Sequence, residues 1–101
     1  MADIPYLYIF LTPGCDPAVH RTSMVTPEGL MTAVGVSEVA QACEVAAAAA
    51  AAGTARFVEL CGAFGEDGCR AVMAAMEGEL PVGYVTYFPE EGARIDALFA
   101  P

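Results

Sequence analysis

The sequence contains no lysine, and its four basic residues are all arginines, against thirteen acidic residues. Proteins bind nucleic acid by replacing the counterions of the phosphates with basic side chains, so a formal net charge of −9 argues against nucleic acid as a partner. The same shortage of positive charge argues against an anionic membrane surface. An anionic ligand would have to be received by one of the arginines or by the N-terminus of a helix.

No two of the four cysteines form a Cys-x-x-Cys pair, so the usual zinc patterns are missing, and we predict no metal and no cofactor. A metal site made by Cys15, Asp16, His20 and Cys61 is the alternative, although this spacing matches no known ligand pattern. The N-terminus has no basic region and no apolar run of signal-peptide length, which favours the cytoplasm, where free thiols are the default. The alanine-rich run of residues 45–52 is too short to span a membrane.

Hydrophobic residues make up 56% of the chain and charged residues 17%, which excludes disorder. The length of 101 residues predicts a single domain over residues 1–101. So apolar a chain is unusual for a small monomer, and the helix that contains the alanine run lacks a polar face in its last two turns. We therefore expect a homo-oligomer, with a second subunit over the alanine surface.

Apolar runs bounded by turn residues predict five strands, at residues 6–11, 22–26, 30–36, 56–61 and 81–88. The first run is apolar at nearly every position, which is typical of a central strand buried on both faces. Helical spacing predicts three helices, over residues 38–52 with Ser37 as the N-cap and Gly53 as the C-cap, over residues 66–77, and from Pro89 onward. The fold class is therefore α/β, a small, mainly parallel sheet with an added β-hairpin, in the order β-ββ-α-β-α-β-α.

The Gly-rich turn at residues 62–68 is the most informative feature, because it joins a strand to a helix. It is neither a phosphate-binding P-loop, since no lysine follows it, nor the dinucleotide-binding fingerprint. In open α/β sheets, ligands bind at the edge where parallel strands end, so the loops after residues 11, 61 and 87 should form one site. The expected ligand-binding residues come from these loops and strand ends: Cys15, Asp16, Arg21, Gly62, Phe64, Gly65, Tyr84 and Thr86.

Three residues are candidates for catalysis. Cys61 lies where the strand meets the turn, and a thiol near a helix N-terminus can act as a nucleophile or an acid. Glu59 lies on the same strand and could serve as a general base. His20 is the only histidine, the residue type best suited to acid–base chemistry near neutral pH, and Arg21 beside it could clamp an anion.

Each candidate also has a purely structural interpretation. Cys61 could be a small core residue, since free cysteines are often buried. Glu59 could form an ion pair with Arg21 or Arg56. His20 could bond to a loop carbonyl, and Arg21 could pair with an acidic neighbour. Aromatic residues near the last strand are typical of ordinary strand positions.

Three motifs occur together: G-x-D-P-x-x-H-R at residues 14–21, E-L-C-G-x-F-G at residues 59–65 and P-V-G-Y-V-T at residues 81–86. With them, nearly the whole chain resembles a family of small prokaryotic proteins of about this length, a domain of unknown function. The chain departs from the family pattern at Ala63, where the family has glycine, and at Cys15, where it has an aromatic residue. The resemblance implies a cytoplasmic, single-domain α/β protein and assigns no activity.

The leading functional hypothesis is a site for a small carboxylate or carbonyl metabolite at the edge where the strands end. Its chemistry would be proton transfer or addition, of isomerase or lyase type, with His20, Glu59 or Cys61 as acid or base and Arg21 as anchor. The alternative is a non-catalytic ligand-binding module or a homo-oligomeric assembly module.

Overall fold

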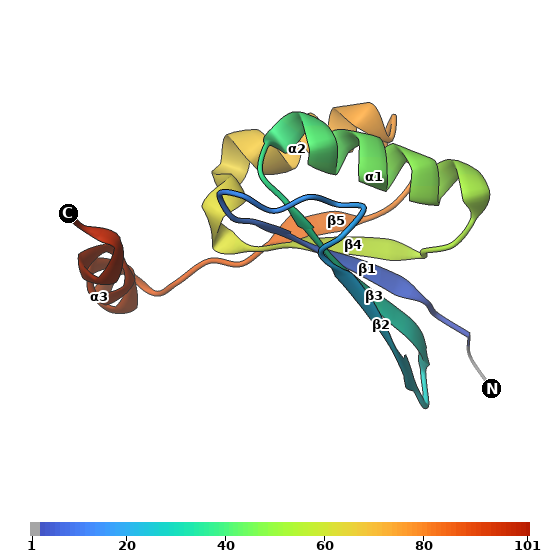
Figure 1. The fold of residues 1–101 in the computed structure, drawn as a ribbon, viewed down its shortest axis with the longest axis horizontal. Helices are drawn as coiled ribbons and strands as arrows, with labels where there is room; N and C mark the ends of the chain where they lie inside the picture. The colour runs from blue at the N-terminus through green and yellow to red at the C-terminus, as the bar shows by residue number, and fades with distance from the viewer. Residues whose placement is uncertain (1–2) are drawn as a thin grey trace.

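A mixed sheet of five strands runs through the structure, a computed structural model that describes residues 3–101 (Figure 1). The strand order is β2-β3-β1-β4-β5; β1 is parallel to β3 and β4, β4 is parallel to β5, and β2 and β3 form an antiparallel hairpin. The elements are β1 (Tyr6–Leu11), β2 (Arg21–Thr26), β3 (Gly29–Val36), α1 (Val39–Ala52), β4 (Phe57–Leu60), the 3-10 turn η1 (Gly62–Phe64), α2 (Gly65–Ala75), β5 (Val82–Tyr84) and α3 (Pro89–Phe99). The predicted fold class and order of elements are confirmed.

The helix α1 begins one residue later than the sequence suggested. Glu38, rather than Ser37, is the N-cap, and the Gln41 side-chain oxygen accepts hydrogen bonds from the N–H groups of Ser37, at 2.8 Å, and Glu38, at 3.2 Å. A long side chain reaching back from the first turn thus satisfies donors that have no partner inside the helix. Gly53 ends the helix with a φ of 70°, as predicted.

Both α1 and α2 lie on the same face of the sheet (Figure 1), and the hydrophobic core lies between them and the strands. Alternate residues of each strand point to this face, because side chains along a strand alternate. The largest fully buried side chains are Ile9, Val34, Val36, Val58, Leu60 and Val72. We call this side of the sheet the covered face.

No element covers the opposite side of the sheet in Figure 1, and we call it the open face. Pairing register and alternation place these strand residues there: Tyr6, Tyr8, Phe10, Thr22, Met24, Thr26, Met31, Ala33, Gly35, Phe57, Glu59 and Gly83. The strand β1 is central, as predicted. Its predicted burial on both faces is wrong for the single chain, because its side chains on the open face are only half-buried.

The last strand is much shorter than predicted. Its partner β4 ends at Leu60, where the chain turns into η1, so the N–H of Val85 donates to the carbonyl of Leu60 and residues 86–88 have no strand to pair with. These residues lead to α3, which stands away from the rest of the molecule (Figure 1) and has no buried residue. Among residues 3–101, no helix is both long enough and apolar enough to cross a membrane.

Candidate functional site

A groove of about 760 Å³ lies where β1, β4 and β5 end, between these strand ends and α3. We call it the strand-end groove. The chain segments that follow the three parallel strands meet there, as parallel pairing requires. It is lined by Phe10, Leu11, Thr12, Pro13, Cys61, Gly62, Ala63, Tyr84, Val85, Thr86, Tyr87, Gly92, Ile95, Asp96 and Phe99.

Four of the predicted site residues line this groove: Cys61, Gly62, Tyr84 and Thr86. The others do not. Phe64 turns into the core, where it is 5% exposed, and Gly65 starts α2 with a φ of 62°, a conformation that glycine adopts without strain.

Cys61 is fixed by the backbone on both sides. Its N–H donates to the carbonyl of Ile9 at 3.1 Å, and the N–H of Leu11 donates to its sulfur at 3.2 Å. The side chain is half-buried and lies at the wall of the groove. The thiol therefore has a defined position between the end of β1 and the start of η1, which a group that transfers protons requires.

Tyr8 is a further candidate residue of the site, which the sequence analysis did not select. Burial raises the pKa of the Tyr8 hydroxyl, and negative charge on nearby Cys61, Tyr87 and Glu59 raises it further. Tyr8 therefore lies within electrostatic range of Cys61, Tyr87 and Glu59. Tyr8 and Glu59 are register partners on β1 and β4, and only the sheet pairing, not a sequence motif, brings them together.

Glu59 lies exposed on the open face, opposite Tyr8 in the sheet pairing. The two ion pairs among residues 3–101 are Arg70–Glu66 and Arg94–Glu91, both on exposed helix surfaces. The predicted alternative, an ion pair between Glu59 and an arginine, is therefore wrong.

His20 stabilises its own loop. Its Nδ1 accepts a hydrogen bond from the N–H of Asp16 at 2.8 Å, and the Asp16 carboxylate accepts one from the N–H of Ala18 at 2.9 Å. The predicted carbonyl partner is therefore wrong, since the bond goes to an N–H group. The structural role itself is present, and neither residue lines the strand-end groove.

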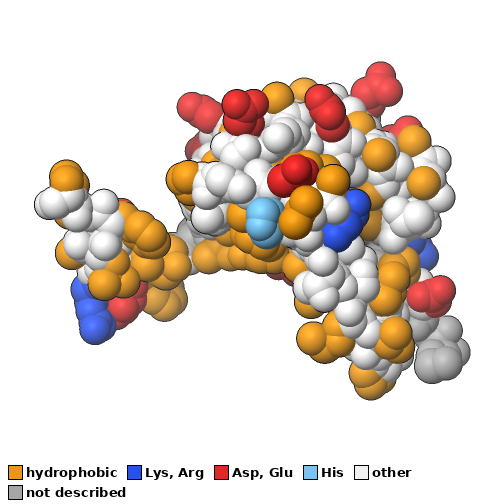
Figure 2. All heavy atoms as spheres, viewed as in Figure 1, with side chains coloured by type: hydrophobic (Ala, Val, Ile, Leu, Met, Phe, Trp, Pro, Cys, Tyr) orange, Lys and Arg blue, Asp and Glu red, His pale blue; other side chains and the backbone are white. Residues whose placement is uncertain are grey.

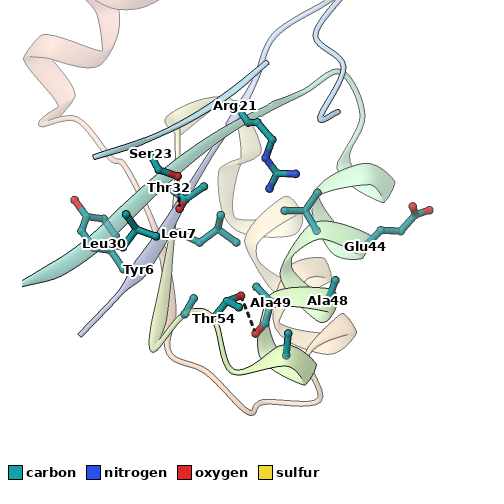
Figure 3. A pocket seen from close by; sticks show the side chains of 13 residues that line it. Tyr6, Leu7, Arg21, Ser23, Leu30, Thr32, Glu44, Ala48, Ala49 and Thr54 are labelled. Carbon is teal, nitrogen blue, oxygen red and sulfur yellow. Dashed lines mark hydrogen bonds between the residues drawn. The ribbon is translucent and has the colours of Figure 1, made fainter. Parts of the chain in front are cut away.

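Arg21 lies in a different groove, of about 710 Å³, between the β2–β3 hairpin and α1. We call it the α1–β2 groove. Figure 3 shows the Arg21 guanidinium pointing toward α1, while Glu44 points away from it. Arg21 pairs with Val34 in the sheet and so shares its side, the covered face, which separates this arginine from the strand-end groove.

Cys15 packs at the far end of the open face. A Cβ at Gly35 would lie 2.6 Å from the Phe10 ring and 3.0 Å from the Cys15 sulfur, so these two side chains occupy the space above the glycine. The absence of a side chain at Gly35 therefore leaves room for the side chains of Phe10 and Cys15. Among residues 3–101 no three His, Cys, Asp or Glu side chains are grouped closely enough to hold a metal ion.

The chain belongs to a protein family: the model described as "Family of unknown function (DUF6506)" matches residues 4–100. This membership confirms the resemblance seen in the sequence. No curated protein and no solved structure matches the chain.

Proposed function

We propose that this member of DUF6506 binds a small, neutral, carbonyl-bearing molecule in the strand-end groove. The observation that carries the proposal is the position of Cys61 at the wall of a groove formed by three chain segments: its sulfur accepts a hydrogen bond from the N–H of Leu11, and its own N–H donates to the carbonyl of Ile9. Concave, largely apolar sites with a few convergent polar groups are the usual form of small-molecule sites.

The lining of the groove favours a neutral ligand. Most lining side chains are apolar, and the polar ones are chiefly hydroxyl groups, such as those of Thr12 and Thr86, which can donate hydrogen bonds to a carbonyl oxygen. Asp96 is the charged side chain of the lining, and no arginine belongs to it. A carboxylate ligand would meet a negative charge with no positive one to offset it, so of the two expected ligand classes the carbonyl compound fits better.

The chemistry that we propose is proton transfer next to the carbonyl group. Cys61 takes a proton from the adjacent carbon as a thiolate and returns it to the product, so that no other reactant is needed. His20 and Arg21 lie outside the groove and take no part in this proposal.

Chemical-shift mapping of the full chain with a set of small ketones, aldehydes and matched carboxylates tests the binding site. We expect the ketones and aldehydes to shift the amide signals of Gly62 and Thr86. Ala63→Leu, which adds bulk inside the groove, should abolish these shifts, whereas Thr54→Val in the α1–β2 groove should leave them unchanged. Shifts confined to Arg21 and Ser23, and caused only by carboxylates, would move the site to the other groove and contradict the proposal.

The proton-transfer step has its own readout, the exchange of deuterium from the solvent into the bound compound. Cys61→Ala should abolish this exchange while binding persists, and Cys43→Ala on α1 is the matched cysteine control. Unchanged exchange in Cys61→Ala would exclude Cys61 as the acid or base.

A further inference from the structure

We propose that a second copy of this chain packs on the open face, related by a two-fold axis, and that α3 of each copy lies against the flank of the other. The proposal concerns assembly and does not depend on whether the strand-end groove binds a ligand.

The open face is apolar and lacks a cover. Tyr6 and Phe57 stack on it with ring centroids 4.7 Å apart and an interplanar angle of 6°, and Met24 on β2 is 59% exposed. The sequence of β1 is apolar on both sides, as in strands buried on both faces, yet α1 and α2 cover one side alone. Soluble monomers rarely expose apolar patches larger than a few hundred Å², so this face is typical of an interface.

The helix α3 also lacks a partner. Apolar side chains of α3 stand in solvent, with Leu98 76% and Phe99 82% exposed, as does its N-cap residue Phe88, 75% exposed. Helices of this length are marginal in water unless an apolar face is buried. Figure 2 shows the outline hollowed between α3 and the rest of the molecule, with hydrophobic side chains along the hollow. A body seated in this hollow would touch both α3 and the open face.

The charge distribution indicates which partner covers the open face. Glu59 is the only charged residue among the strand residues of the open face, whereas Figure 2 shows acidic side chains along the opposite, helix-covered side. Two copies with a net charge of −9 each repel one another least when they meet at surfaces that carry little charge, and the open face is such a surface. Each chain exposes both an apolar sheet face and an apolar helix. A two-fold axis brings the same surface of each copy together, so a single interface can bury the sheet face and the helix of both copies.

The area is sufficient for a stable dimer. Five strands at a spacing of about 4.8 Å and a length of about 20 Å give the open face about 480 Å². Half of the surface of the eleven-residue α3 adds about 250 Å². The total approaches the roughly 800 Å² per partner of a standard stable interface. Because the groove lies between the strand ends and α3, the second copy would also close the strand-end groove.

Light scattering and native mass spectrometry of the full chain test the proposal. We expect a mass of twice the 10.4 kDa of one chain. Met31→Glu places a charge on the open face, where water solvates it in a monomer. In the dimer the same charge would be unpaired in an apolar interface, which is strongly unfavourable, so the dimer dissociation constant should rise at least about a hundredfold. Leu98→Glu on α3 should weaken the dimer in the same direction.

Ala51→Glu is the matched control, because it places the same charge on the exposed alanine surface of α1. A dimer that dissociates with Ala51→Glu but not with Met31→Glu would place the interface on α1 and overturn the proposal. A wild-type chain that stays monomeric at high micromolar concentration would also overturn it and leave the face to another partner. Should Met31→Glu fail to fold, intermolecular nuclear Overhauser effects in a mixture of labelled and unlabelled wild-type chains decide. Contacts between the Tyr6 and Phe57 rings of one chain and the open-face methyl groups of the other, such as that of Met24, support the interface, and their absence contradicts it.

Discussion

The two faces of the sheet are built from alternate residues of the same strands, and yet they differ in what they do. Leu60 and Ile9 on the covered face are 0% exposed and pack against α1 and α2, whereas their neighbours Glu59 and Tyr8 on the open face reach solvent. The covered face therefore stabilises the single chain, while the open face and the groove at its edge hold the side chains available for a ligand or a partner. We therefore expect that substitutions one residue apart in the same strand can change either the stability of the chain or its proposed functions.

The largest expected effect is on the covered face. Leu60→Ala removes a fully buried side chain from the core and should lower the free energy of unfolding by about 3 kcal/mol at any protein concentration. Phe57→Ala on the open face should cost about 1 kcal/mol in dilute solution, because its ring is only half-buried. Urea unfolding at two protein concentrations measures both. Equal and concentration-independent losses would remove the distinction between the faces.

A smaller effect is expected within the open face itself. Gly35→Ala brings a methyl group within 2.6 Å of the Phe10 ring, so the ring must move, and stability should fall by about 1 to 3 kcal/mol. Gly83→Ala is the matched control: it also lies on the open face, no atom lies within 4 Å of the added carbon, and the change should stay within about 0.5 kcal/mol. Thermal unfolding compares the two, and a neutral Gly35→Ala would contradict the tight packing of Phe10 and Cys15.

The smallest effect is a pH dependence. Burial raises the pKa of Cys69 on α2 above its ordinary value of 9.0, although Arg70 opposes this, so the folded state holds the thiol proton more tightly than the unfolded state. The resulting stability is fully present below pH 9.0 and is lost as the pH rises above it. Urea unfolding below and above that pH should show the decline, and Cys69→Ala should make it shallower. A rise in stability over this range would contradict the assignment.

On the open face, ionisation of Tyr8 should lower the stability at a higher pH than ionisation of Cys69 does. The raised pKa of Tyr8, due first to burial, predicts a further loss of stability above its ordinary value of 10.0. If the second copy covers this face, the ultraviolet absorbance titration of Tyr8 should move to higher pH as the protein concentration is increased, and Tyr8→Phe should remove that part of the titration.

The order of the elements could be predicted because each is encoded locally. The apolar run of β1 ends at Thr12 and Pro13, Gly53 allows the left-handed turn after α1, and Pro89 starts α3. The end of β5 could not be predicted, because it depends on where the neighbouring strand stops. Residues 85–88 have β-forming side chains, but β4 turns away at Cys61, and a strand without a partner does not form.

The residues of the candidate site could be predicted only where strand order and strand ends decide their position. Cys61, Gly62, Tyr84 and Thr86 follow directly from parallel strands that end at one edge. Arg21 was misplaced because its direction depends on register: a shift of one residue in the pairing of β2 with β3 would turn it to the other face.

The sequence by itself determined the α/β class, the alternation of strands and helices and the edge at which the groove lies, because local propensity, turn residues and the rules of parallel connection are short-range or topological constraints. Only the tertiary structure decided which face of the sheet the helices cover, that α3 stands apart, and that Tyr8 and Glu59 lie opposite each other on neighbouring strands. These features depend on packing between distant segments, and an apolar residue has the same tendency to leave water whether a helix of its own chain or another molecule covers it.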